Sequence, residues 1–178
     1  LIKNLSNRLE NYFITDLFLN IPFITENQIT YFYNPKTKRC IMASSDRFVF
    51  YDSLESRFVF LNKICNNILK NSPKLDENFR KLDFLHPIIT KMKEGDSRIK
   101  TLEYNIFDKW CLEKVDVIKS ANILNKSYFD DKQLNQALKN LSKSLNPDGI
   151  LAITRNRSSN NEEIASLLKL DKNKNLTL

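Results

Sequence analysis

The sequence predicts an α/β domain of three layers, in which a mostly parallel sheet carries helices on both faces. Short apolar, β-branched runs alternate along the chain with segments of helical period, and this order is typical of parallel sheets. The length of 178 residues is that of about one domain. Apolar residues make up 42% and charged residues 28%, close to the globular average. We therefore expect residues 1–178 to form a single domain.

The first half of the chain is assigned from short patterns. "NYFITDL" (residues 11–17) predicts a buried strand, and residues 25–33 predict a short helix with a threonine cap. Residues 39–45 predict a second strand, which runs up to Asp46. Residues 47–85 are a poorly defined insertion, because their aromatic-rich runs suit either a β-hairpin or part of a helix.

The alternation resumes after this insertion. "HPIITKMKEG" predicts a helix that begins after His86 and ends at Gly95, and residues 99–105 predict a strand. Because His86 precedes a proline, we interpret it as a residue that starts the helix or packs beside it, and not as a catalytic base.

The C-terminal part has the clearest pattern. A β-branched run predicts a buried strand over residues 114–119, which opens into small and polar residues. Asp130 and Gln133 form a capping-box pattern for a helix over residues 131–145, and "NPDG" then leads into a strand over residues 149–154. The apolar stripe of the helix consists of Leu134, Leu138, Leu141 and Leu145. Strand, helix and strand with short connections predict a right-handed crossover whose strands are covered on both faces.

Charge and composition argue against several classes of protein. A formal net charge of +7 suits nucleic acid or an anionic surface, but the lysines are scattered among asparagines, which favours an ordinary solvated surface. Three widely spaced cysteines and one histidine argue against a disulfide framework and a zinc site, and favour a reducing cytoplasm. No apolar stretch approaches the roughly 18 residues of a membrane span. The chain begins at Leu1, as a fragment or a trimmed chain would.

Residues 115–155, "VDVIKSANILNKSYFDDKQLNQALKNLSKSLNPDGILAITR", resemble the second half of class I S-adenosylmethionine (SAM)-dependent methyltransferases, a group that includes the chemotaxis-receptor methyltransferases. In that family a strand written roughly "FDVIRxxNhL" is followed by a helix and by "LxPGGhLhh". Here the last piece is "LNPDGILAIT", with Asp148 in place of the first glycine. The resemblance covers about a quarter of the chain. It implies a Rossmann-like three-layer methyltransferase domain, SAM as cofactor, and a methyl acceptor that the sequence does not identify.

The resemblance also implies which residues contact the cofactor. The family often has an acidic residue beside the adenine ring, after the third strand, and Asn105 or Asp108 would take that role. A carboxylate after the second strand accepts hydrogen bonds from both ribose hydroxyls, and Asp46 matches it, although an aspartate there also suits a strand end or a helix cap. The full set of implied contacts is Asp16, Asp46, Asn105, Asp108, Ser120 and Asn122. No catalytic residue and no metal ligand is predicted.

The stretch "TDLFLNIPFIT" compares with the family pattern "hDhGxxxGhT", whose glycines bend the backbone under the methionine part of SAM. Asp16 and Thr25 fit loosely, but Phe18 and Pro22 stand where the glycines belong. The chain contains only two glycines in all, where about 7% is average. This predicts weak or absent SAM binding in the usual pose, unless the alignment is displaced or the glycine loop precedes Leu1.

Three functions remain open at this point. The first is an active methyltransferase, in which catalysis consists mainly of aligning a nucleophile with the methyl group of SAM. The second is a degenerate, catalytically inactive methyltransferase fold that acts as a protein-interaction scaffold. The third is a basic nucleic-acid-binding module. The glycine deficit favours a degenerate or truncated methyltransferase, and the sequence leaves open whether the chain is an enzyme and how many copies associate.

Overall fold

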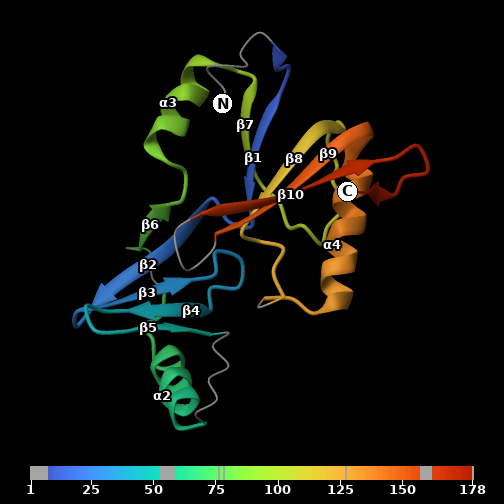
Figure 1. Cartoon of the computed structure of the whole chain (residues 1–178). Helices are drawn as coiled ribbons and strands as arrows, with labels where there is room; N and C mark the ends of the chain where they lie inside the picture. The colour runs from blue at the N-terminus through green and yellow to red at the C-terminus, as the bar shows by residue number, and fades with distance from the viewer. Residues whose placement is uncertain are drawn as a thin grey trace. The chain divides into compact units, whose positions relative to one another are not determined.

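The computed structural model describes residues 8–52, 59–75, 77, 79–126, 128–156 and 162–177. Within these residues the fold is mixed α/β, with three helices and three sheets (Figure 1). The chain divides into two compact units, Leu1–Glu103 and Tyr104–Leu178. We call them unit 1 and unit 2, and each is described by itself.

Unit 1 contains one pair of parallel strands. β1 (Tyr12–Asp16) pairs with β7 (Ile99–Glu103), and Figure 1 shows these two distant segments of the chain side by side. α3 (Pro87–Gly95) precedes β7, and Nδ1 of His86 accepts a hydrogen bond from the Ile88 N–H at 3.2 Å. The predicted strands, the predicted helix and the role of His86 at its start are therefore confirmed.

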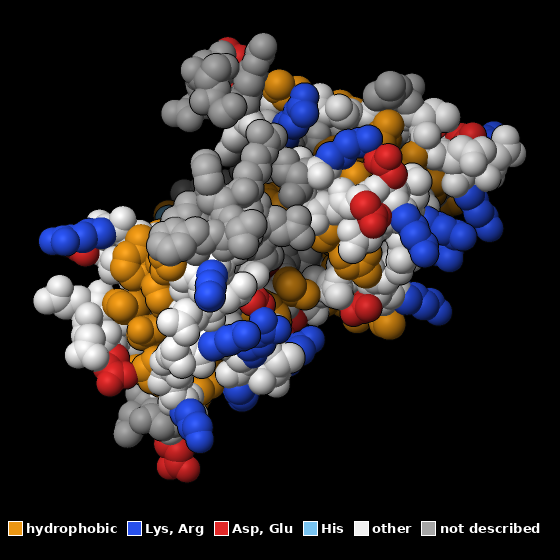
Figure 2. All heavy atoms as spheres, turned by 90° about the horizontal axis from the view of Figure 1, so that it is seen from below, with side chains coloured by type: hydrophobic (Ala, Val, Ile, Leu, Met, Phe, Trp, Pro, Cys, Tyr) orange, Lys and Arg blue, Asp and Glu red, His pale blue; other side chains and the backbone are white. Residues whose placement is uncertain are grey.

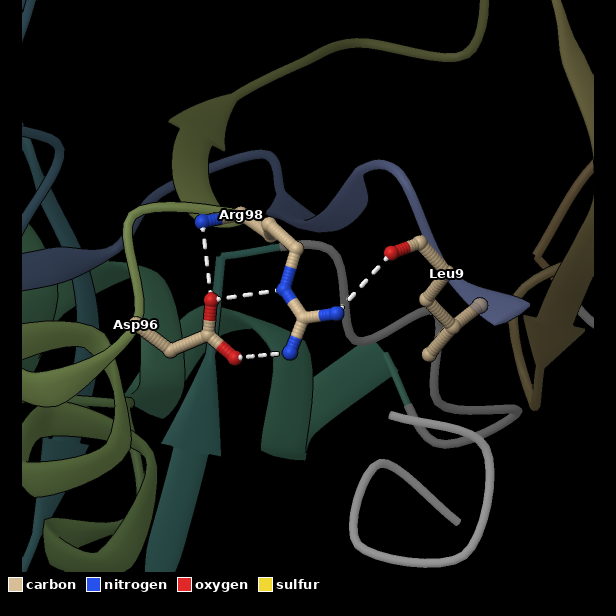
Figure 3. A network of polar contacts seen from close by, with 3 residues as sticks. All are labelled: Leu9, Asp96 and Arg98. Atoms are coloured by element: carbon tan, nitrogen blue, oxygen red, sulfur yellow. Dashed lines mark hydrogen bonds and ion pairs between the residues drawn. The ribbon is translucent and has the colours of Figure 1, made fainter. Parts of the chain in front are cut away.

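A turn before β7 is hydrogen-bonded to the segment that precedes β1 (Figure 3). Nε and Nη2 of Arg98 donate to the two carboxylate oxygens of Asp96 at 2.9 and 2.7 Å, and Nη1 donates to the Leu9 carbonyl at 3.1 Å. The hydrogen bonds from the Arg98 side chain lower the pKa of Asp96 to about 2. This network joins the beginnings of the two parallel strands.

Unit 1 also contains, among its described residues, an antiparallel sheet of five strands and the helix α2. In spatial order the strands are β5 (Val49–Tyr51), β4 (Cys40–Ser44), β3 (Ile29–Tyr33), β2 (Asn20–Glu26) and β6 (Arg80–Asp83). α2 (Val59–Lys70) packs against β4, and the core between them contains Tyr33, Cys40, Ala43 and Leu69. The stretch of residues 47–85 thus begins as a strand and continues as a helix, while residues 53–58 lie outside the described part of the chain.

Two predictions for this region are wrong. Residues 25–33 form the β2–β3 hairpin and not a helix, because their β-branched and aromatic side chains suit a strand and the two turn residues, Asn27 and Gln28, adopt φ values of 51° and 65°. The sheet is also not mostly parallel. Among the described strands only β1–β7 and β8–β9 run parallel. Short turns join β2 to β3, β3 to β4 and β4 to β5 and so make these neighbours antiparallel, and β6 returns to pair antiparallel with β2.

Unit 2 contains a strand–helix–strand unit extended by a hairpin. Its elements are β8 (Val115–Ala121), α4 (Asp131–Ser144), β9 (Leu145–Asn156), β10 (Glu163–Leu170) and β11 (Leu176–Thr177). β8 and β9 are parallel, whereas β10 runs antiparallel to both β9 and β11. The predicted sequence of strand, helix and parallel strand is confirmed.

α4 begins with the predicted capping box. The Asp130 carboxylate accepts from the Gln133 N–H at 2.8 Å, and Oε1 of Gln133 accepts from the Asp130 N–H at 3.0 Å. The helix covers one face of the sheet through a core of Leu141, Leu145, Leu151 and Leu170. On the other face the side chains of Val117 and Leu167 are 62% and 60% exposed. The prediction that both faces are covered is therefore wrong for the part of unit 2 that the structure describes.

The "NPDG" segment lies within β9. α4 ends at Ser144, and the pairing of β8 with β9 shifts between Val115 and Val117 to admit the extra residues. Asp148 has φ 63°, a conformation that glycine adopts most easily and that aspartate tolerates better than most residues. Asp148 thus occupies a left-handed position at the point where the resembling family has a glycine.

Candidate functional site

In unit 1, the carboxyl ends of β1 and β7 bring two acidic side chains together. Asp16 and Glu103 are direct partners in the parallel pairing, and both are exposed. Oδ1 of Asp16 accepts from the Leu17 N–H at 2.6 Å, and Oε1 of Glu103 accepts from the Leu19 N–H at 3.3 Å. Ligands of α/β proteins bind beyond the carboxyl ends of parallel strands, so this edge is where a ligand of unit 1 would be expected.

The backbone amides after β1 hold these carboxylates in place. Because Oδ1 of Asp16 is bound to the adjacent N–H, the plane of the carboxylate is fixed relative to the strand. A carboxylate oxygen has two lone pairs, so Oδ1 and Oδ2 together can still accept hydrogen bonds from two hydroxyl groups. The arrangement suits a neutral ligand that donates hydrogen bonds, such as a diol, since two neighbouring carboxylates repel an anion.

Asp46 lies elsewhere in unit 1, at the bend between β4 and β5. Both of these strands belong to the antiparallel sheet, so the premise that Asp46 follows a parallel strand is wrong. Its carboxylate is exposed and lies 3.9 Å from Nε of Arg47, at the outer limit of an ion pair. The hairpin places Asp46 and Asp16 on different sheets.

Phe18 and Pro22 do not lie in a strand–turn–helix segment. β1 leads through a bend into strand β2, where Pro22 is buried and pairs with Lys81 of β6. In the resembling family the corresponding glycine turn leads into a helix, so the alignment of this stretch with that turn has no counterpart in the structure. Thr25 lies in β2, where its hydroxyl is 3.1 Å from the hydroxyl of Thr30.

In unit 2, Asn105 and Asp108 share one turn. The Asn105 side chain accepts from the Phe107 N–H at 3.0 Å, and its carbonyl accepts from the Asp108 N–H at 2.9 Å. Asn140 of α4 donates to the carbonyls of Ile106 and Phe107 at 3.2 and 2.8 Å. Asn140 therefore holds the loop that carries the two predicted residues, and its only signal in the sequence is a polar residue within the helix.

The ends of β8 and β9 bring Ser120 and Asn122 together. Oδ1 of Asn122 accepts from the Asn156 N–H at 2.9 Å, and the Asn122 N–H donates to the Thr154 carbonyl at 2.8 Å. Ser120 lies inside β8, where it is 5% exposed, and its hydroxyl has no hydrogen-bond partner among the described residues. Asn122 thus joins the ends of β8 and β9 by hydrogen bonds. The buried hydroxyl of Ser120 has no such partner among the described residues.

Several basic side chains of unit 2 are neutralised locally. Lys119 pairs with Glu163 at 2.8 Å, and Lys169 pairs with Asp148 at 2.9 Å. Figure 2 shows Lys and Arg side chains scattered over the visible face, with Asp and Glu side chains among them. Across the described ranges, no cluster of three or more His, Cys, Asp or Glu residues could hold a metal ion. No helix in these ranges has the length and apolar character needed to cross a membrane.

Comparison with known proteins gives partial matches to solved structures. No family model and no curated protein matches the chain. The N-methyltransferase NodS from Bradyrhizobium japonicum WM9, in complex with S-adenosyl-L-homocysteine (SAH), is 28% identical, with a TM-score of 0.31 over 36% of this chain and 32% of that chain. A complex of LepI with SAM is 15% identical, with a TM-score of 0.30 over 56% of this chain and 25% of that one. The matches thus span about a third or less of the length of these proteins.

Proposed function

We propose that the chain is a class I methyltransferase-like protein that binds the adenosyl part of SAM or SAH through Asp16. The observation that carries the proposal is the position of this carboxylate, at the carboxyl end of β1 and beside the parallel strand β7. In nucleotide-binding α/β proteins ligands bind beyond the carboxyl ends of the parallel strands, and an acidic side chain in that region accepts hydrogen bonds from the ribose. In this proposal Asp16, and not Asp46, accepts the hydrogen bonds from the ribose hydroxyls.

The residues of unit 1 fit the ribose better than they fit the methionine part of the cofactor. A ribose diol offers two donors, and the fixed Asp16 carboxylate offers acceptors in one plane. The two glycines of the chain are Gly95, at the end of α3, and Gly149, within β9, so neither forms a tight turn after β1. When bound, SAM would supply an activated methyl group. The side chains of this chain would orient its adenosine, and we expect weak binding.

A second candidate is an inactive methyltransferase fold that acts as a protein-interaction scaffold. It rests on the sheet face of unit 2 that α4 does not cover, where Val117, Ile150 and Leu167 are exposed. Val117 and Ile150 are direct partners in the pairing of β8 with β9, so their side chains share that face. Contiguous exposed apolar residues are typical of interaction surfaces.

Calorimetric titration of the full chain with SAH tests the first candidate. We expect saturable binding that is about tenfold weaker in Asp16→Ala, since hydrogen bonds to a charged group contribute about 1.5 to 3 kcal/mol. Asp46→Ala is the matched control, because it removes the same charge from the same unit, and we expect its affinity to remain within about twofold.

The outcomes separate the candidates. An absence of heat at millimolar SAH would refute cofactor binding and leave the scaffold. Binding that is lost in Asp46→Ala but kept in Asp16→Ala would return the ribose contact to the residue that the sequence suggested.

A further inference from the structure

A pocket of about 450 Å³ lies in unit 1 between α2 and the β3–β4 hairpin. Its floor is apolar and consists of Tyr33, Cys40, Leu69 and Leu75, three of which are buried and one partly buried. Known small-molecule sites have volumes of about 300 to 1,000 Å³ and mostly apolar linings with a few polar groups. The volume of this pocket falls within that range, and its lining combines an apolar floor with several polar and charged residues.

The rim of the pocket is basic. It carries Lys38, Arg39, Lys70 and Lys74, with Asp52 as its only acidic residue among the described ones. Nη2 of Arg39 binds Oδ1 of Asp52 at 2.7 Å, so these two charges neutralise each other. Within the part of the chain that the structure describes, none of the three lysines forms an ion pair with an acidic side chain. The rim therefore has an uncompensated positive charge.

The two titratable side chains of the floor, Tyr33 and Cys40, carry no negative charge that would offset the lysines. The Tyr33 hydroxyl donates to the Pro73 carbonyl at 2.6 Å, and burial raises the pKa of Tyr33 to about 12. Burial also raises the pKa of the Cys40 thiol. Both groups therefore stay neutral at pH 7. The pocket thus combines an uncharged floor with three lysines, of which Lys38 also has its Nζ 5.9 Å from the centroid of the Phe79 ring.

The hairpin that carries Lys38 and Arg39 is held by its own hydrogen bonds. The Asn34 side chain accepts from the N–H groups of Lys36 and Thr37 at 2.9 and 3.0 Å, and the Asn34 N–H donates to the Arg39 carbonyl at 2.9 Å. Lys38 has φ 59°, a left-handed conformation that the turn imposes on a residue other than glycine. This side of the pocket is therefore ordered without a ligand, which lowers the entropic cost of binding.

We propose that this pocket binds a small organic phosphate monoester with an aromatic or aliphatic body. Three lysines act as point charges and match a phosphate, which carries close to two negative charges at pH 7, better than they match a single carboxylate. The apolar floor receives the body of the ligand. The site lies on the antiparallel sheet and uses neither Asp16 nor Glu103, so it stands independently of the proposed cofactor binding.

Calorimetric titration of the full chain with phenyl phosphate tests the proposal, with inorganic phosphate and phenol as partial ligands. We expect phenyl phosphate to bind about tenfold more tightly than either, because it fills the floor and engages the rim. Equal affinities for phenyl phosphate and inorganic phosphate would show attraction by surface charge alone and would overturn the proposal. So would the absence of saturable binding of phenyl phosphate.

Paired lysine variants locate the site. Lys70→Gln with Lys74→Gln should weaken phenyl phosphate binding by about tenfold, since each exposed charge contact contributes about a threefold effect. Lys36→Gln with Lys63→Gln is the control, because it removes the same net charge from unit 1. Lys63 lies in α2, as Lys70 does, and Lys36 lies in the β3–β4 turn. Neither residue lines the pocket, so affinity should stay within about twofold. Equal losses in the two double variants would place the binding elsewhere.

Discussion

Gly149 lies where neighbouring atoms leave no room for a β-carbon. A β-carbon added there would lie 2.8 Å from the Asn146 carbonyl oxygen and 3.1 Å from the Asp116 carbonyl oxygen, both of them backbone atoms. The other glycine, Gly95, has no atom within 4 Å of the same position. The chain thus offers two glycines that differ in the space beside them.

Gly149→Ala should destabilise the protein by about 1 to 3 kcal/mol, because the backbone must shift to relieve the overlap. Gly95→Ala is the control and should be neutral or slightly stabilising, since alanine reduces the entropy of the unfolded chain. Urea denaturation followed by circular dichroism measures both. Similar stabilities of the two variants would contradict the close approach at Gly149.

The Asp96 carboxylate gives the stability of unit 1 a defined pH dependence. Its pKa is lowered to about 2 in the folded state by the Arg98 side chain, against an ordinary value of 3.8. The contribution is therefore complete above the ordinary value and is lost as the pH falls through about 2. Asp96→Asn should be less stable than the parent chain at pH 7, and the difference should shrink toward pH 2.

Urea denaturation of both chains at several pH values measures this difference. Arg98→Gln should remove the same pH dependence, because the guanidinium is what stabilises the charged carboxylate. A gap between Asp96→Asn and the parent that is constant from pH 7 to pH 2 would mean that the ion pair contributes nothing.

At the scale of elements, α4 shows how the leucine stripe is divided between core and surface. Leu141 is 5% exposed and belongs to the core of unit 2, whereas Leu138 packs against that core from a partly buried position. Ala137 is fully buried beside them. The face of the helix that meets the sheet is therefore centred on Ala137 and Leu141.

Leu141→Ala should cost about 2 to 5 kcal/mol, as expected for a buried large-to-small change that leaves a cavity. Leu138→Ala should cost less, because part of its side chain already contacts solvent. The free energy of unfolding from urea titrations compares the two. A larger loss for Leu138→Ala would mean that the helix meets the sheet through a different face.

At the scale of the whole molecule, the described residues form two separate hydrophobic clusters. The cluster around Tyr33 and Leu69 lies in unit 1, and the cluster around Leu145 and Leu151 draws all its members from unit 2. A unit that contains its own core is able to fold by itself. Small domains bury a smaller fraction of their surface, so we expect a low free energy of unfolding.

Residues 104–178 expressed alone should therefore fold, with a helical signal from α4 and a cooperative urea transition. The same fragment with Gly149→Ala is the control and should unfold at lower urea. A fragment without a cooperative transition would show that unit 2 depends on the rest of the chain.

The sequence by itself determined the elements whose contacts are local. The capping box joins Asp130 and Gln133, three residues apart, and the periodic leucines of residues 131–144 define one face without reference to any partner. The parallel strands on either side of α4 followed from their β-branched runs and short connections. The contacts Asn105, Asp108, Ser120 and Asn122 came from the family resemblance and stay predictions.

Only the tertiary structure decided which strands pair with each other. Residues 25–33 satisfy a capping pattern and a strand composition equally well, and the choice depends on β4 and β2 as hydrogen-bonding neighbours. Asp16 and Asp46 each follow a short apolar strand, so the local sequence does not distinguish them. β1 pairs in parallel with β7, a segment far along the chain, whereas β4 joins an antiparallel sheet. Because strand pairing is set by hydrogen bonds between distant residues, the fold alone placed Asp16 at the edge where α/β proteins bind their ligands.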